Sequence, residues 1–490
     1  MNITSSASNS LPNILVEVDH VVSAPAFEVR ANTYTTNAQI NPVVTYLADG
    51  GWVVVWQSYG QVGAAVGPLN YDLYAQRYSA DGRVIGSEFK VNSYTYQSQS
   101  NPSVAALQDG GWIIAWHSDG GDVDGGAGIT AVRFSSDGSY VPVADPSLFS
   151  AGGGNSPTNF RVNTSTYSGQ DNPSVTTLAD GGWLIVWQSN TQDGSGAGIY
   201  GRRFNNSGFA LGNDFRVNTY TSGDQSHPSV TALLDGGWLI AWQSIGQDGA
   251  SGGVYAQRYN SNGVAVGQEF LVNLTVTNFE ALPSVAPLSD GGWVIVWTSY
   301  SNENGSGYGI YGQRYNGNGL KLGSEFIVSS PANGVNSPPS ITTLGDGGWL
   351  VSWQVNGDIY AQRYDLAGGL IGSVFRVDSY ANYDQINPAV SALSDGGWVI
   401  TWQSNGQDGS NFGIYSQRYD AYGNQANTQT ITIYEPASAG DFTVGKVLHA
   451  DPSHISDTDG VTSITWHWQR SADNGTTWTD IPNASTSSYT

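Results

Sequence analysis

Aspartates beside glycines are the residues of this chain whose types and spacing best suit chemistry. One group lies in the segments ADPSH and ISDTDG and comprises Asp451, Asp457 and Asp459. A second group lies in the segment DGGDVDGG and comprises Asp119, Asp122 and Asp124. Short acidic turns rich in glycine offer carboxylate and carbonyl oxygens to a hard cation such as Ca²⁺. Both groups are therefore candidate calcium sites, and for each the alternative is an ordinary solvated turn.

Residues for nucleophilic or acid–base catalysis form no recognisable pattern. The chain has no Cys, which excludes thiolate nucleophiles and cysteine-ligated zinc. Its six His show no H-E-x-x-H spacing, and neither a G-x-S-x-G elbow nor a phosphate-binding loop occurs. The sequence therefore predicts no catalytic residues and a protein that is not an enzyme.

The elements that position the aspartates are built from one repeat. The string DGGW occurs seven times, beginning at Asp49, Asp109, Asp180, Asp235, Asp290, Asp346 and Asp395. In every copy a second Trp follows four residues after the first, and two Trp in each of seven copies make 14 of the 17 Trp. A period of about 55 residues made of short strands is typical of β-propeller blades.

Each copy is predicted to form four antiparallel strands. The first begins at a Phe and alternates as in FRVNTYT, and the second opens with a Pro as in PSVTAL. Asp-Gly-Gly is expected to form a type I′ hairpin turn, because Gly tolerates positive φ. The third strand, as in WVIVWQS, is apolar at consecutive positions, so we expect both faces to be covered and both Trp to share one face. Helix should be nearly absent.

The predicted fold class is all-β, a closed seven-bladed β-propeller with four antiparallel strands per blade, followed by a truncated immunoglobulin-like β-sandwich. The domains are an N-terminal extension at 1–26, the propeller at 27–423, a linker at 424–429 and the incomplete sandwich at 430–490. Within the extension, residues 14–22 (ILVEVDHVV) are expected to add an edge strand or to close the ring. The turn Asp473-Asn474-Gly475 indicates a hairpin in the sandwich. About 60 residues are short for such a sandwich, so we expect the natural protein to be longer.

One arginine recurs in the fourth strand of every repeat, at Arg77, Arg133, Arg203, Arg258, Arg314, Arg363 and Arg418. Antiparallel pairing brings the end of this strand beside the Asp-Gly-Gly turn, which predicts an Arg–Asp pair within each blade. A two-pronged guanidinium contact suits this role better than a lysine. The alternative is a ring of arginines that binds anions.

The net charge limits the classes of partner that the protein can be expected to bind. The 17 Lys and Arg against 40 Asp and Glu give a net charge of −23, which repels phosphate backbones and anionic headgroups. We therefore expect no nucleic-acid partner and no membrane insertion. No apolar run approaches the roughly 20 residues that a bilayer requires, and the N-terminus lacks a basic start followed by an apolar stretch.

The repeat F-x-V-N-T…P-S-V…D-G-G-W-x-x-x-W-Q-S…Q-D-G-S-G…I-Y-x-Q-R-Y, over residues 27–419, resembles the propeller-like repeats of large secreted proteins of Gram-negative bacteria, including RTX-type adhesins and hemolysin-type calcium-binding proteins. The tail from about Thr443, with WQRSADNGTTWTDI, resembles the immunoglobulin-like modules of the same proteins. This resemblance implies an extracellular or cell-surface location reached by type I secretion. The chain has no G-G-x-G-x-D nonapeptide, so the calcium-binding β-roll of that family does not carry over.

The function expected from these observations is a non-catalytic extracellular binding or adhesion module, stabilised by Ca²⁺ and directed at a glycan or another cell-surface ligand. It would be a monomeric segment of a longer chain. Two alternatives stay open at this point. One is a structural spacer in a surface array, and the other is a polysaccharide-directed enzyme whose acid and base cannot be placed from the sequence.

Overall fold

The structure is a computed structural model that describes residues 16–20, 28–62, 70–95, 97–120, 126–143, 145–148, 159–166, 168–249, 251–274, 278–301, 307–332, 337–426, 431–435, 448–449, 469–470, 479–480 and 488–489. The chain divides into two compact units. The larger unit is Glu28–Gln425, and the smaller unit combines Met1–Phe27 with Ala426–Thr490.

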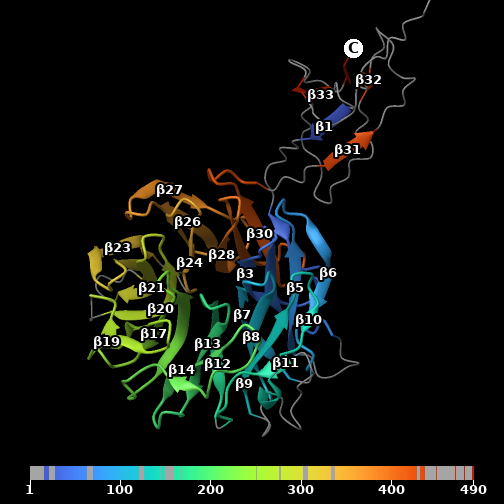
Figure 1. Cartoon of the computed structure of the whole chain (residues 1–490). Coiled ribbons are helices and arrows are strands. Elements are labelled where there is room, and N and C mark those ends of the chain that lie inside the picture. The colour runs from blue at the N-terminus through green and yellow to red at the C-terminus, as the bar shows by residue number, and fades with distance from the viewer. Residues whose placement is uncertain are drawn as a thin grey trace, which may run out of the picture. The chain divides into compact units, whose positions relative to one another are not determined.

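The larger unit is a seven-bladed β-propeller (Figure 1). The innermost strands of blades one to seven are β3 (Gln39–Tyr46), β7 (Gln99–Ala106), β12 (Gln170–Thr177), β16 (Gln225–Ala232), β20 (Phe279–Pro287), β24 (Ser340–Thr343) and β28 (Gln385–Ala392). The second strands are β4 (Trp52–Tyr59), β8 (Trp112–Ser118), β13 (Trp183–Asn190), β17 (Trp238–Ser244), β21 (Trp293–Ser301), β25 (Trp349–Val355) and β29 (Trp398–Asn405).

The third strands are β5 (Tyr71–Tyr78), β9 (Gly128–Phe134), β14 (Ala197–Phe204), β18 (Gly253–Tyr259), β22 (Gly307–Tyr315), β26 (Asp358–Tyr364) and β30 (Phe412–Tyr419). The outer strands are β6 (Val84–Lys90), β10 (Tyr140–Val141) with β11 (Asn159–Arg161), β15 (Phe215–Arg216), β19 (Ala265–Leu271), β23 (Lys321–Ala332), β27 (Leu370–Arg376) and β2 (Val29–Arg30). All pairings within the blades are antiparallel. Within the described residues the one helical element is the 3₁₀ turn Pro146–Leu148, which agrees with the expected near absence of helix.

The ring of blades is closed by the first strand of the larger unit. The innermost strands contact one another in order around the ring, and β28 contacts β3. The N-terminal strand β2 then completes the last blade by pairing with β30, with Val29 opposite Ser416. The first and last parts of the propeller are therefore held together by backbone hydrogen bonds, and the predicted closure is confirmed.

Blade boundaries differ from the expected ones by one strand. The Phe-containing segment was expected to open its own blade, but Phe89 lies in β6, the outer strand of the blade that precedes the next Pro and DGGW. A half-buried alternating strand fits an outer edge, which packs on one side only. Of the segment 14–22, the structure describes β1 (Val16–His20), which pairs with β31 (Ile431–Glu435) in the smaller unit and not with a propeller strand.

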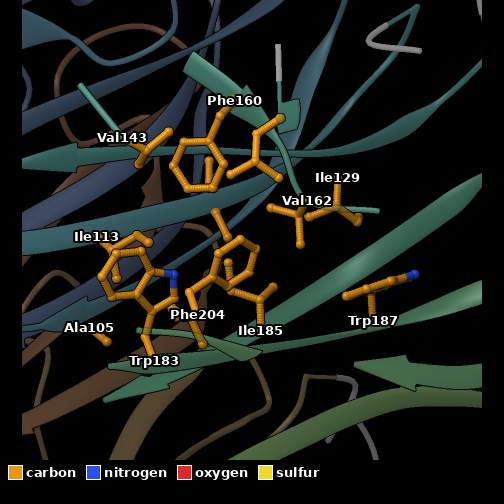
Figure 2. Packing of buried hydrophobic residues seen from close by; sticks show 14 of the residues in the cluster. Ala105, Ile113, Ile129, Val143, Phe160, Val162, Trp183, Ile185, Trp187 and Phe204 are labelled. Carbon is orange, nitrogen blue, oxygen red and sulfur yellow. The ribbon is translucent and has the colours of Figure 1, made fainter. Parts of the chain in front are cut away.

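Tryptophans hold neighbouring blades together. The two Trp of each DGGW unit and the residue midway between them lie on one face of the second strand, and they pack against the other face of the preceding blade's second strand. Trp183, Ile185 and Trp187 thus belong to one buried cluster with Ile113 and Ala115. Figure 2 shows Trp183 beside Ile113 in this cluster. Both faces of the second strand are buried from its first Trp to its second, as predicted, and in blade three this stretch is Trp183 to Trp187.

The Asp-Gly-Gly turn is a three-residue loop and not the expected type I′ turn. Among the turn residues 48–51 of blade one, only Gly50 has positive φ (86°), and the Leu47 N–H donates to the Gly51 carbonyl at 2.7 Å. This is a type I turn followed by a left-handed glycine. The second glycine is required by packing, because a Cβ on Gly51 would lie 2.0 Å from the Tyr78 carbonyl oxygen. Each Gly therefore has a different physical role.

The predicted Arg–Asp pair is present in all seven blades. It is not two-pronged, however. In blade four one nitrogen of Arg258, Nη2, lies 2.5 Å from Asp235 Oδ2, while Asp235 Oδ1 accepts the N–H of Gly237 at 2.9 Å. The guanidinium also lies 5.5 Å from the ring centre of Trp293 in the next blade. The arginine therefore joins a turn to the neighbouring blade, which favours the structural role over an anion-binding ring.

The smaller unit contains short strand pairs among its described residues. β32 (Leu448–His449) pairs with β35 (Ser488–Tyr489), and β33 (Gln469–Arg470) pairs with β34 (Thr479–Asp480). The second pairing joins the segments on either side of Asp473-Asn474-Gly475, as a hairpin there requires. The immunoglobulin-like sandwich as a whole stays a prediction.

Candidate functional site

An axial pocket opens at one end of the propeller. It has a volume of about 510 Å³ and is lined by the residues at which the innermost strands bulge. These residues are Asn41, Pro42, Val43, Asn101, Pro102, Asn172, Pro173, His227, Pro228, Leu282, Pro283, Pro338, Pro339, Ser340, Asn387, Pro388 and Ala389. Its size is within the range of about 300–1,000 Å³ that is usual for small-molecule sites.

The bulges arise from an Asn-Pro step within the inner strand. Pro was expected to open this strand, but β3 begins three residues earlier, and the register of its pairing shifts between Ile40 and Val43. Asn41 takes a left-handed conformation, with φ of 52°, that lets the chain pass the imino acid without a ladder hydrogen bond. Ser58 pairs with Gln39 at the same end, so the loops between second and third strands surround the pocket mouth. We call this end of the ring the loop end and the opposite end the turn end.

A glutamine in the second strand normally locks each bulge to the next blade. Gln57 of blade one accepts the backbone N–H of Asn101 in blade two at 3.0 Å. Gln403 and Gln188 do the same for the bulges of the following blades, accepting the N–H of Asn41 at 2.8 Å and of His227 at 3.2 Å. The pocket wall is thus a circuit, meaning a ring of amide groups that are hydrogen-bonded from one blade to the next.

The circuit is broken between blades two and three, where ionisable groups replace amides. Blade two has His117 in place of the glutamine, and Asp171 of blade three supplies the missing acceptor. Asp171 Oδ1 accepts the backbone N–H of Asn172 at 2.7 Å and the side-chain N–H of Asn101 at 2.9 Å. Asp171 Oδ2 accepts no hydrogen bond from the described residues. One carboxylate oxygen therefore serves the fold, and the side chain remains 34% exposed.

His117 connects this carboxylate to a second one. Its Nε2 lies 2.9 Å from Asp119 Oδ1, and its Nδ1 lies 2.7 Å from the Gln170 carbonyl and 3.4 Å from Asp171 Oδ1. The imidazole is 15% exposed, and the side chains of Asp119 and Asp171 are 50% and 34% exposed. These two contacts on one imidazole limit the separation of the Oδ1 atoms to at most about 8.5 Å, compared with roughly 6.5–9.5 Å between the two carboxyl groups of inverting glycosidases.

His227 is the fourth ionisable group, and it lines the pocket directly. It occupies the bulge position of blade four with φ of 52°, where blades one, two, three and seven have Asn. Burial of the ring lowers the pKa of His227, and the charge of Asp171 partly opposes this shift. The residue as a whole is nevertheless exposed, so its imidazole is accessible from the pocket that it lines. His227 and the His117 cluster, defined as Asn101, His117, Asp119 and Asp171, together form the candidate site.

Of the six predicted calcium ligands, the structure places Asp119 alone. Asp119 contacts His117. The other five, Asp122, Asp124, Asp451, Asp457 and Asp459, lie outside the described residues. No group of three or more His, Cys, Asp or Glu with the arrangement of a metal site occurs in the part of the chain that the structure describes.

The acidic loops between second and third strands have a structural use. In blade four the Asp248 carboxylate lies in the space that a Cβ on Gly253 would occupy, 2.9 Å away. Blade one has no loop acid and instead carries Asp72 at the glycine's own position, where Asn92 donates to it at 2.6 Å. Burial raises the pKa of Asp72 to about 6, against the effect of this hydrogen bond. A carboxylate beside the start of the third strand therefore recurs as a structural feature of the blades, and its presence does not require a bound cation.

Sequence reasoning missed His117, Asp171 and His227 as site residues. A signal was present, because each breaks the repeat at one position in three consecutive blades. Their convergence could not be read from the sequence, since it depends on the strand register and on which loops meet at the axis. The missed step was to compare the repeats position by position for titratable substitutions.

No protein-family model matches the chain, and no curated protein sequence matches it. Solved structures with a similar arrangement of strands include the polysaccharide lyase Uly1, with a TM-score of 0.49 and 11% identity, covering 84% of this chain and 98% of the lyase. The α-L-arabinanase of Penicillium chrysogenum complexed with arabinobiose has a TM-score of 0.43 and 16% identity, covering 66% of this chain and 93% of the arabinanase. The α-L-arabinofuranosidase of Fusarium graminearum with arabinobiose has a TM-score of 0.42 and 12% identity, covering 65% of this chain and 92% of that chain.

These neighbours correct the functional expectation. The sequence was predicted to encode a non-catalytic adhesion module and not an enzyme, because the propeller repeats contain no familiar catalytic motif. The structures that resemble this propeller include two enzymes named for arabinose-containing substrates and a polysaccharide lyase, so that inference is wrong. The likeness concerns the fold and assigns no residue. Among the described residues no helix is long and apolar enough to cross a membrane.

Proposed function

We propose that the propeller is a carbohydrate-active enzyme that binds a neutral glycan in the axial pocket and cleaves a glycosidic bond beside it, with Asp171 and Asp119 as the acid–base pair. One observation carries the proposal. In a ring of seven similar blades, four titratable departures from the repeat, His117, Asp119, Asp171 and His227, gather in consecutive blades next to the pocket. Perturbed and clustered titratable groups beside a concave pocket support a catalytic site.

The chemistry of the pocket favours a neutral polymer. Its lining contains Asn, Pro, Ser and His but no Lys, Arg, Asp or Glu. The chain carries a net charge of −23, which opposes the approach of a polyanion such as a polyuronate. Amide and imidazole groups around an apolar rim of prolines suit the hydroxyl groups and C–H faces of uncharged sugars. Hydrolysis therefore fits this site better than β-elimination from a uronate.

The proposed reaction conserves its protons. One carboxylate, Asp171, takes a proton from the water that attacks the anomeric carbon, while the carboxyl of Asp119 gives a proton to the departing glycosidic oxygen. The anomeric carbon gains a C–O bond to water and loses the C–O bond to the leaving sugar. His117 contacts both carboxylates, so it holds them in place and offers a route by which the proton can return from Asp171 to Asp119.

The test is a reducing-end assay of the full chain on debranched arabinan, xylan and a linear β-glucan, with a polyuronate as the charged comparison. Asp171→Asn keeps the oxygen that accepts from Asn172 and removes the charge, so we expect at least a 100-fold loss of kcat with an unchanged melting temperature. Asp137→Asn, an exposed carboxylate at the turn end, is the matched control and should retain full activity. Absence of new reducing ends from every neutral polymer, or full activity of Asp171→Asn, would overturn the proposal.

A further inference from the structure

Tyr383 combines two unusual properties at the loop end of blade seven. Its backbone has φ of 61°, in the left-handed region that a bulky side chain rarely adopts. Its side chain is 72% exposed, among the most exposed large apolar groups of the described residues. The same position, two residues before the Gln that starts the inner strand, is held by Asn37, Ser168 and Gly223 in other blades, with φ of 64°, 67° and 72°.

The turn does not require an aromatic residue. Asn, Ser and Gly adopt the same conformation at lower cost, since short polar side chains and glycine tolerate positive φ. Burial does not explain the tyrosine either, because most of its surface faces solvent. Strained backbone that persists without a structural reason is typical of functional positions.

The aromatic ring of Tyr383 packs against Gly406 on one side and is exposed on the other. A Cβ placed on Gly406 would lie 3.1 Å from Tyr383 Cδ2 and 3.4 Å from Cε2, so the tyrosine ring lies directly over this glycine. Gly406 belongs to the turn between β29 and β30, at the loop end of the same blade. One side of the ring thus rests on backbone while the rest stays open to solvent.

Tyr383 also lies close to the axial pocket along the chain. Three residues separate it from Asn387, which lines the pocket; Tyr383 precedes β28 and Asn387 lies within it. The exposed ring is therefore at the same end of the propeller as His227 and the His117 cluster.

We infer that Tyr383 is a sugar-stacking subsite on the rim, which binds a glycan unit several residues away from the bond cleaved in the pocket. The inference rests on the proposed function. A tyrosine offers a flat apolar face for the C–H groups of a sugar ring and a hydroxyl for its polar edge, and it loses little conformational entropy because it has two side-chain torsions. The subsite takes extended neutral oligosaccharides and has no role for a disaccharide.

The experiment compares Tyr383→Asn with the wild type on an arabinan hexasaccharide and an arabinan disaccharide. Asn restores the residue type found at Asn37, so the melting temperature should stay equal or rise. We expect KM for the hexasaccharide to increase at least tenfold with kcat changed less than twofold, and the disaccharide kinetics to stay the same. Tyr422→Asn is the matched control, because Tyr422 is 87% exposed in a turn at the turn end and should affect neither substrate.

The outcomes separate this inference from the proposed function. If Asp171→Asn abolishes cleavage while Tyr383→Asn leaves hexasaccharide KM unchanged, the subsite is wrong and the catalytic proposal stands. If the wild type cleaves neither substrate, direct binding of the hexasaccharide is measured by calorimetry. Binding weakened tenfold by Tyr383→Asn then supports the subsite without catalysis, and binding unaffected by it overturns the subsite. A fall in the melting temperature of Tyr383→Asn would show a structural role and would also overturn it.

Discussion

Trp297 donates its indole N–H to Glu280 Oε2 at 2.7 Å, in the place where Trp116 of blade two donates to Gln99 at 2.7 Å. Glu280 is 2% exposed and also accepts the Ser299 hydroxyl at 2.9 Å. The blades that begin their inner strand with glutamine use Gln39, Gln99, Gln170, Gln225 and Gln385. Blade five thus buries a carboxyl where an amide makes the same contact.

The pH dependence of stability should reveal this carboxyl. Burial raises the pKa of Glu280 from 4.5 to about 7, the hydrogen bonds from Ser299 and Trp297 oppose the shift, and the charges of Glu325 and Asp248 add to it. The folded state therefore binds the proton more tightly than the unfolded state. Its contribution to stability is full below pH 4.5 and is lost as the pH rises to about 7.

Glu280→Gln should remove this dependence, because glutamine accepts the same indole N–H and does not ionise. At pH 8 we expect the variant to be more stable than the wild type by up to about 3 kcal/mol, and at pH 4.5 the two should be equal. Denaturant unfolding at both pH values measures the difference. A constant offset between the two proteins across this range would contradict the assignment.

Trp242→Ala tests the packing between blades three and four. Trp242 is fully buried and packs with Val186 and Ile240. Its truncation should leave a cavity and cost about 3–5 kcal/mol of unfolding free energy. Leu234→Ala, at a side chain that is 67% exposed, provides the comparison and should change stability by less than about 0.5 kcal/mol.

Arg258→Lys tests the contact between a turn and the next blade. Partial burial by itself would raise the pKa of Asp235, but the hydrogen bonds from Gly237 and Arg258 lower it. Lysine keeps the charge but loses the planar group over Trp293, so we expect a loss of about 1 kcal/mol, as measured by thermal unfolding. Arg83→Lys is the control, because Arg83 pairs with Asp81 on the surface and is 55% exposed. Equal losses in the two variants would show that the Trp contact contributes nothing.

Gly237→Ala tests why the repeat needs two glycines. A Cβ at Gly237 would lie 2.1 Å from the Tyr259 carbonyl oxygen, so the backbone must move and we expect a cost of about 3 kcal/mol or more. Gly249 has φ of 84° with open space around its Cβ position. Gly249→Ala should therefore cost only the backbone strain, about 1 kcal/mol. Circular dichroism melting of both variants measures the contrast.

Calcium binding at Asp457 and Asp459 stays a prediction of the sequence. If the turn holds Ca²⁺, calorimetric titration of the full chain should show one saturable event that the double variant Asp457→Ala/Asp459→Ala lacks. Stabilisation would then reach about 2.7 kcal/mol at a hundredfold excess of Ca²⁺ over Kd. Identical titrations of the two proteins would leave only general screening of the acidic chain.

The sequence by itself determined the blades. Seven DGGW units predicted the number of blades, the apolar second strand with both Trp on one face and the Arg–Asp pair, because each of these depends on residues close together in one repeat. Period-two alternation and turn chemistry act over a few residues, so they can be read without a fold.

Only the tertiary structure showed where one blade ends and the next begins, and where the residues that depart from the repeat come together. The outer strand joins the preceding blade, and Val29 pairs with Ser416 at the far end of the propeller, since ring closure depends on contacts between distant segments. His117 and Asp171 stand 54 positions apart in the sequence numbering, yet their side chains lie 3.4 Å from each other. Local patterns cannot encode that distance, because the curvature of the whole ring brings the two blades together at the axis.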